Sequence, residues 1–160
     1  MKHYQIFTDG SCLKNPGGAG GIGAVIITDG YYEEVSCGFE APTTNNQMEM
    51  YAAIIALESL PERSKVTLIS DSQYLINTMS KGWKKKKNLT HWNRLDSVAR
   101  NHSINWKWVK GHNGNKYNEL CDHLAMQAAL SAQSPAHAGN LMTLPCLNYL
   151  DDQLSLSLAI

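Results

Sequence analysis

Tyr4-Gln5-Ile6-Phe7-Thr8-Asp9-Gly10-Ser11-Cys12 is the stretch of sequence that decides the fold. Its β-branched and aromatic residues are typical of a strand, and glycine after an acid favours a sharp turn. The stretch therefore predicts a first strand over residues 4–9, with the carboxylate of Asp9 at its end. The elements on the C-terminal side of this strand then determine how it is paired.

The residues that follow predict an antiparallel meander. Residues 15–21 are a glycine-rich turn region, and the apolar run 21–28 is typical of a second strand. Asp29-Gly30 is a strong hairpin signal, so a third strand is expected over residues 31–39.

The rest of the chain alternates between helices and strands. Good helix formers occupy residues 47–60, Pro61 ends that helix, and residues 65–70 form a fourth strand. Because the fourth strand is reached through a helical crossover, it should pair in parallel with the first. The remaining expected elements are a short helix at 71–79, a helix at 89–102, a strand at 103–109 and a helix at 115–132. This order is that of an α/β fold with a mixed sheet.

Length and composition fit one globular domain. The chain has 160 residues, of which 43% are apolar and 18% charged. No apolar run approaches the roughly 18 residues of a membrane span. Because Met1 leads straight into the first strand, we expect no signal peptide. The four cysteines lack metal-ligand spacing, which favours free thiols in a reducing cytosol. We therefore expect a cytoplasmic protein.

The distribution of charge is more informative than the formal net charge of zero. A neutral chain argues weakly against a nucleic-acid partner, because domains that bind nucleic acids are often basic. Five lysines nevertheless lie within seven residues, interleaved with Trp83: Lys81, Lys84, Lys85, Lys86 and Lys87.

The composition changes after Ser134. Residues 135–140 are typical of a linker, and residues 141–160 contain leucines without a clear helical or strand period. We expect a domain over residues 1–133 and an appended segment over residues 134–160.

Four acids lie where the predicted fold brings side chains together. Asp9 ends the first strand and Asp71 follows the fourth, and the carboxyl ends of neighbouring parallel strands are where sites form. Glu49 and Asp122 are each in line with alanines that would press a helix against the sheet. An acid on a packed face is costly without a cation, and like charges raise each other's pKa values.

Two Mg²⁺ or Mn²⁺ ions would remove both costs and would suit the cleavage of a phosphodiester. Each acid alone also has an ordinary explanation, as a turn residue, a helix cap, a partner of a helix dipole or a solvated helix position. The convergence of all four favours the metal site. His112, between Gly111 and Asn113-Gly114, is either a surface loop residue or a group that transfers protons.

Four blocks of the sequence resemble ribonuclease H of type 1, the family of nucleases that act on RNA–DNA hybrids. They occur in the family's order and cover roughly residues 4–132. The blocks are Thr8-Asp9-Gly10-Ser11-Cys12 with Asn15-Pro16-Gly17, Thr43-Thr44-Asn45-Asn46-Gln47-Met48-Glu49, Ser70-Asp71-Ser72-Gln73, and Trp108-Val109-Lys110-Gly111-His112 with Asn118-Glu119-Leu120-Cys121-Asp122.

The resemblance implies a five-stranded mixed sheet of order 3-2-1-4-5 flanked by helices. It implies an endonuclease that hydrolyses the RNA strand of a hybrid with two metal ions and leaves 5′-phosphate and 3′-hydroxyl ends. The implied tasks are the removal of primers in DNA replication and of R-loops. The residues that match the family's metal-binding acids are Asp9, Glu49, Asp71 and Asp122. His112 matches a histidine linked to proton transfer and product release, and Glu119 an acid near the metals.

The resemblance also implies substrate contacts and weak sequence preference. Thr44 and Asn46 match residues that hold a DNA phosphate, and contacts to the RNA strand and the minor groove are implied for Cys12, Asn15, Asn45 and Gln73. Many bacterial members carry a longer basic helix and loop where this chain has residues 81–87. Trp83 fits either the DNA channel or the core, and Lys84 and Lys85 remain candidate phosphate contacts.

The last residues resemble a short motif that binds the bacterial sliding clamp. The motif comprises Gln153, Leu154, Leu156 and Leu158, after a tether of roughly 20 residues. An edge strand or an apolar tail is the alternative. For the whole chain, a transposase or resolvase core and an inactive hybrid-binding module are the competing functions. We expect a monomer.

Overall fold

The computed structural model describes residues 1–133, so the predicted linker and clamp motif at 134–160 lie outside the described residues. The strands are β1 (His3–Cys12), β2 (Gly20–Thr28), β3 (Tyr31–Phe39), β4 (Lys65–Ser70) and β5 (Ser103–Trp108). The helices are α1 (Asn45–Glu58), α2 (Gln73–Lys81), α3 (Leu89–Ala99) and α4 (Lys116–Gln133). All nine elements were expected from the sequence, with bounds shifted by up to three residues.

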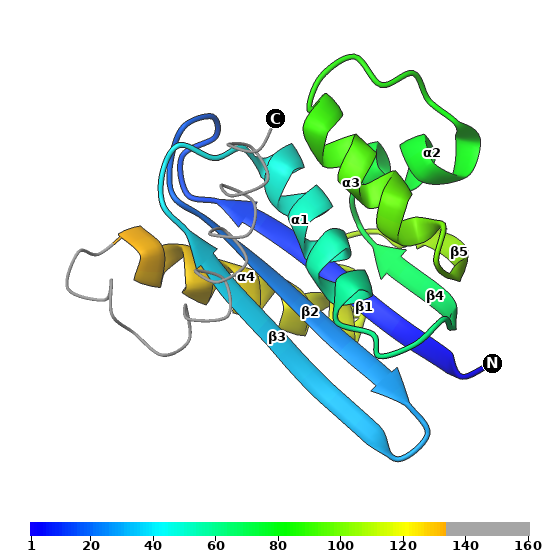
Figure 1. Cartoon of the computed structure of the whole chain (residues 1–160). Helices are drawn as coiled ribbons and strands as arrows, with labels where there is room; N and C mark the ends of the chain where they lie inside the picture. Colours follow the sequence, from blue (N-terminus) through cyan, green and yellow to red (C-terminus); the bar gives the residue numbers. More distant parts are fainter. Residues whose placement is uncertain (134–160) are drawn as a thin grey trace.

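The strands form one mixed sheet of order β3-β2-β1-β4-β5 (Figure 1). Strand β1 pairs antiparallel with β2 and parallel with β4, and β4 pairs parallel with β5. The predicted α/β class and the predicted strand order are therefore confirmed.

The helices lie on both faces of this sheet. Ile6 belongs to the core that includes α1 and α3, whereas its neighbour Phe7 packs with Cys121 of α4. Successive side chains of a strand point to opposite faces, so α1 and α4 lie on opposite sides. Figure 1 shows α1 and α3 together in front of the sheet and α4 behind it.

Three glycines bring α4 close to the backbone of β2 and β3. A Cβ atom at Gly21 would lie 2.1 Å from the carbonyl oxygen of Ala125, and one at Gly23 would lie 2.3 Å from that of Cys121. At Gly38 the corresponding distance, to the carbonyl oxygen of Ala128, is 2.6 Å. A side chain at any of these positions would push α4 away from the sheet.

Two expectations need correction. Asp9 does not end its strand, because β1 continues to Cys12 and pairs with Gly20 of β2. Only the parallel pairing with β4 stops before Asp9. Cys12 and Cys121 are free thiols as expected, but Cys37 is disulfide-bonded, so the expectation of free thiols is wrong there. Within residues 1–133, no helix combines the length and apolar character needed to cross a membrane.

Candidate active site

Asp9 and Asp71 meet because of the register between β1 and β4. The last paired residues of these parallel strands are Phe7 and Ile69. Asp9 lies two residues after Phe7, and Asp71 lies two residues after Ile69. The predicted neighbourhood of these two acids is therefore a consequence of strand pairing, although Asp9 lies inside β1.

Glu49 reaches both strands from the first turns of α1. The helix begins after Thr44, whose side-chain oxygen accepts a hydrogen bond from the Gln47 amide at 3.1 Å. Glu49 Oε1 accepts from the Gly10 amide at 2.7 Å, and Oε2 accepts from the Ser70 hydroxyl at 3.3 Å. These two bonds fix the carboxylate between the β1 and β4 chains.

Gly10 makes the close approach of α1 to β1 feasible. A Cβ atom at this position would lie 2.4 Å from the backbone nitrogen of Glu49. The same residue donates its amide to Asp9 Oδ1 at 2.9 Å and to Glu49 Oε1. Gly10 thus holds two acids through one backbone group.

Asp9, Glu49 and Asp71 form a compact acidic cluster. One oxygen of each carboxylate lies within 4.8 Å of those of the other two. Asp9 is only 4% exposed and Glu49 only 8%. Burial, followed by the charge of Glu49 and the charges of Asp71 and Asp122, raises the pKa of Asp9 far above its usual range. Burial also raises the pKa of Glu49, against hydrogen bonds that lower it. Carboxylate oxygens in this arrangement suit a hard divalent cation.

The other two predicted catalytic residues border this cluster. Asp122 of α4 is half-buried, lies outside the compact triad, and contributes to the raised pKa of Asp9. His112 is exposed, with a φ of 54°, in the loop between β5 and α4. That loop lies against the acids, because a Cβ atom at Gly111 would be 2.7 Å from Asp71 Oδ2. The structure thus brings all four acids, and the loop that carries the histidine, to one place.

Most of the chain matches the model of one known protein family. The model of the RNase H family matches residues 1–130 of the chain. The chain belongs to the ribonuclease H family. It is an enzyme of the nuclease and hydrolase class, and the family depends on metal ions, for which the acidic cluster provides the ligand type.

Curated relatives named ribonuclease H cover most of the chain. The protein of Shewanella sp. strain ANA-3 is 49% identical over 152 residues, which are 87% of this chain and 95% of the relative. The protein of Shewanella denitrificans is 52% identical over 141 residues, 80% of this chain and 87% of the relative.

Solved type 1 ribonucleases H share the fold. LC9-RNase H1, described as a type 1 enzyme with the type 2 active-site motif, has a TM-score of 0.71 at 29% identity and covers 84% of this chain and 74% of its own. LC11-RNase H1 in complex with an RNA/DNA hybrid has a TM-score of 0.64 at 25% identity, covering 82% of this chain and 99% of its own.

Three of the predicted substrate residues form one hydrogen-bonded group in this ribonuclease H. Asn45 Oδ1 accepts a hydrogen bond from the backbone amide of Cys12 at 2.9 Å, and the backbone amide of Asn45 donates to Asn15 Oδ1 at 3.1 Å. The group links the end of β1, the turn after it and the start of α1. Asn46 and Gln73 are exposed at the first residues of α1 and α2.

The basic loop, residues 83–87, lies between α2 and α3. Trp83 is 48% exposed, so it is not a core residue, and Lys84 is also exposed. Lys85 instead donates to Asp96 Oδ2 of α3 at 2.6 Å. The sequence does not distinguish Lys85 from Lys84, and it does not predict that the Ser70 hydroxyl contacts Glu49 or that Gly111 lies against Asp71. A serine before an acid and a glycine before a histidine are the only sequence signals for these contacts.

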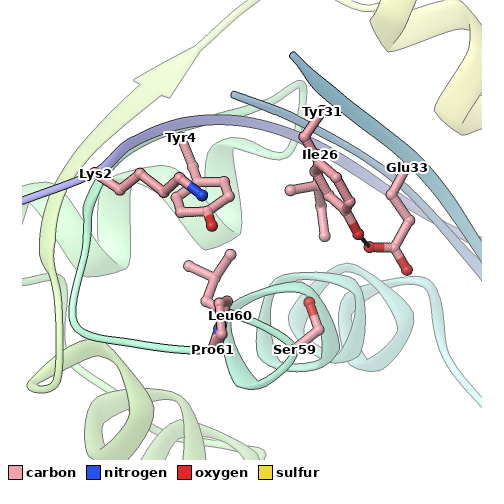
Figure 2. Close-up of a pocket in the computed structure, with 8 residues that line it drawn as sticks. All are labelled: Lys2, Tyr4, Ile26, Tyr31, Glu33, Ser59, Leu60 and Pro61. Carbon is pink, nitrogen blue, oxygen red and sulfur yellow. Dashed lines mark hydrogen bonds between the residues drawn. The ribbon is translucent and has the colours of Figure 1, made fainter. Parts of the chain in front are cut away.

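A separate hollow of about 320 Å³ lies at the other end of β1 from Asp9. Figure 2 shows Lys2 and Tyr4 on one side of it, Tyr31 and Glu33 on the other, and Leu60 and Pro61 after α1. None of its lining residues belongs to the acidic cluster. The hollow is therefore not the site of the chemistry described above.

Proposed function

We propose that this ribonuclease H is an endonuclease that hydrolyses the RNA strand of RNA–DNA hybrids and leaves 5′-phosphate and 3′-hydroxyl ends. The observation that carries the proposal is the cluster of Asp9, Glu49 and Asp71 within 4.8 Å in a member of this family. A related solved structure, that of LC11-RNase H1, holds an RNA/DNA hybrid. The cellular tasks we propose are removal of replication primers and of R-loops in the cytoplasm.

The four acids are proposed as ligands of two Mg²⁺ ions, with Mn²⁺ as a substitute. The residues fit divalent cations because buried carboxylates repel one another and carry raised pKa values in the absence of a cation. Asp9, Glu49 and Asp71 would hold the ions together with Asp122 of α4. When bound, the ions supply activation of a water molecule and stabilisation of the leaving oxygen.

The protein's own groups orient the acids and move protons. The Gly10 amide and the Ser70 hydroxyl keep the Glu49 carboxylate between β1 and β4. His112 is exposed on the loop beside Asp71, where its imidazole can take a proton from water and deliver one to the leaving oxygen. The loop position also suits the release of product.

The polar group at the end of β1 is proposed to select the hybrid. Cys12, Asn15, Asn45 and exposed Gln73 offer amide and backbone groups that can test for 2′-hydroxyls in a shallow minor groove. Thr44 and Asn46, at the start of α1, suit a phosphate of the DNA strand. The exposed Trp83 and Lys84 are proposed to contact the same strand, and Lys85 was predicted to join them. Sequence preference should be weak.

One assay separates this function from its competitors. A labelled hybrid is incubated with and without Mg²⁺, beside DNA and RNA duplexes of the same sequence. We expect Mg²⁺-dependent cleavage of the RNA strand of the hybrid alone. Cleavage of the DNA duplex would indicate a transposase-like or resolvase-like core, and binding without cleavage would indicate an inactive hybrid-binding module. Asp71→Asn is the inactive variant, and Asp29→Asn, an exposed change in the β2–β3 turn, is its matched control.

We propose that residues 1–133 are the catalytic domain and that the protein is a monomer. We also propose that Gln153, Leu154, Leu156 and Leu158, outside the described residues, bind the bacterial sliding clamp. The alternating leucines would fill an apolar groove while the glutamine fixes register. Truncation after Ser134 should abolish capture by the clamp and leave hybrid cleavage intact. Undiminished capture would reject the clamp peptide, and loss of folding would assign the segment a structural role.

A further inference from the structure

The basic loop, residues 83–87, is bounded by two residues with left-handed backbone. Gly82 has a φ of 67° and ends α2, and Asn88 has a φ of 58° and precedes α3. Asn88 occupies the position of a helix cap, yet its side chain makes no capping hydrogen bond. Its Nδ2 instead donates to the Tyr74 hydroxyl at 3.3 Å. A side chain at this position would normally accept a hydrogen bond from a free backbone amide in the first turn of α3. The Asn88 side chain instead ties the loop to α2.

The Tyr74 hydroxyl joins the loop to the helix that starts at the acidic cluster. It accepts a second hydrogen bond from Trp92 Nε1 at 3.2 Å, and the two rings lie 5.2 Å apart. Tyr74 stands next to Gln73 in the first turn of α2, and only Ser72, the N-cap of that helix, separates it from Asp71. The end of the basic loop is therefore held at a fixed place relative to the acids.

Lys85 differs from the other lysines of the loop in its surroundings. It is half-buried, whereas Lys84, Lys86 and Lys87 are exposed. Its ammonium group donates to Asp96 Oδ2 at 2.6 Å and lies 6.0 Å from the centre of the Trp92 ring. The charge that could meet a phosphate already has a carboxylate partner in the protein.

We propose that Tyr74, Lys85, Asn88 and Asp96 form an anchor that holds the basic loop in place for the hybrid, and that Lys85 is a positioning residue and not a phosphate contact. This loop anchor leaves Lys84, Lys86 and Lys87 free to bind phosphates. It raises affinity because a loop held before binding loses less conformational entropy when the substrate arrives. The inference rests on the proposed role of the basic loop in hybrid binding.

The first test measures KM and kcat of Lys85→Met and Asp96→Asn on the same hybrid at several salt concentrations. Both variants should raise KM by about two- to fivefold, the range that a partly exposed ion pair supports, with kcat unchanged. The slope of log KM against log salt should stay as in the wild type, because no phosphate contact is lost. If Lys85 instead binds a phosphate, Asp96→Asn should lower KM, because it frees the ammonium group. Lys85→Met should then reduce the slope of log KM against log salt by about 0.9. Either result would overturn the anchor.

The charge-swapped double variant is the decisive control. Lys85→Asp combined with Asp96→Lys restores the ion pair and the net charge but leaves no cation at position 85. Recovery of the wild-type KM supports the anchor, and a KM that stays as high as in Lys85→Met overturns it. Thermal unfolding of each variant checks that the fold is kept.

A third variant tests the loop itself. The triple change Lys84→Gln, Lys86→Gln and Lys87→Gln should raise KM more than loss of the anchor does and should reduce the salt slope by more than 1. An unchanged KM would overturn both the role of the loop and the anchor, while cleavage of the hybrid would still support the proposed function.

Discussion

Replacing Asp9 by asparagine should stabilise the metal-free protein while abolishing its activity. Asp9 is 4% exposed, and burial and three neighbouring acids raise its pKa well above 7. Between an unfolded pKa near 3.8 and pH 7 lie about 3 pH units. At about 1.36 kcal/mol per unit, the carboxyl group lowers the free energy of unfolding by at most about 4 kcal/mol at pH 7. An amide keeps the oxygen that accepts from Gly10 and adds an N–H that can donate to Glu49, so we expect a gain of about 2 to 4 kcal/mol.

The size of this stabilisation changes with pH in a defined way. Because the folded pKa is raised, the folded state binds more protons than the unfolded state between pH 4 and the folded pKa. The free energy of unfolding of the wild type therefore falls as pH rises through this window. The difference between Asp9→Asn and the wild type should be near zero at pH 4 and should grow up to pH 7.

The measurement is thermal unfolding in EDTA at pH 4, 5.5 and 7. A gain of about 2 kcal/mol or more corresponds to a melting temperature at least about 5 °C higher for a domain of this size. Addition of Mg²⁺ should raise the melting temperature of the wild type more than that of the variant. Asp29→Asn serves as the control for a lost charge. A variant less stable than the wild type in EDTA at pH 7 would mean that Asp9 is a structural acid and would refute the reasoning.

Three further predictions concern the loop beside Asp71 and the charge of the surface. Gly111→Ala should lower kcat by about tenfold or more with little change in KM, since the new methyl group would lie 2.7 Å from Asp71 Oδ2; wild-type kcat would show that the carboxylate moves freely. His112→Ala should lower kcat by about 10²-fold and flatten the pH profile of kcat, measured from pH 5 to 9; an unaltered profile would remove the histidine from proton transfer. The short basic loop should give weaker hybrid affinity and a shallower salt dependence than relatives with the longer basic segment, as measured by a salt titration of binding; a slope indicating many released counterions would contradict this.

The strand order and the acids were predictable because both depend on local patterns. Alternation, glycine turns and helix formers define the order of elements, and acids beside small residues on packed faces are unusual enough to be noticed. Asp9 and Asp71 could be placed together because their strands are parallel. The extension of β1 to Cys12 was missed because Gly10 suggested a turn, whereas pairing with the glycines of β2 continues the strand.

The contacts that depend on tertiary packing were not predictable. Lys85 and Asp96 are eleven residues apart on a loop and a helix, and no spacing rule joins them. Tyr74 appeared to be an ordinary residue of a short helix. The contact of Ser70 with Glu49 depends on how closely α1 packs on the sheet. The sequence indicates that α1 packs there but not at what distance.

The glycines beneath α4 have a consequence for how the protein tolerates change. Asp122 follows Cys121, whose carbonyl oxygen lies over Gly23, so the position of this acid is set by the absence of a side chain on β2. In a library of single substitutions scored by cleavage, Gly23 and Gly21 should be as intolerant as the acids, although neither offers a group to metal or substrate. An inventory of essential residues would thus include positions whose whole contribution is the space that they leave empty.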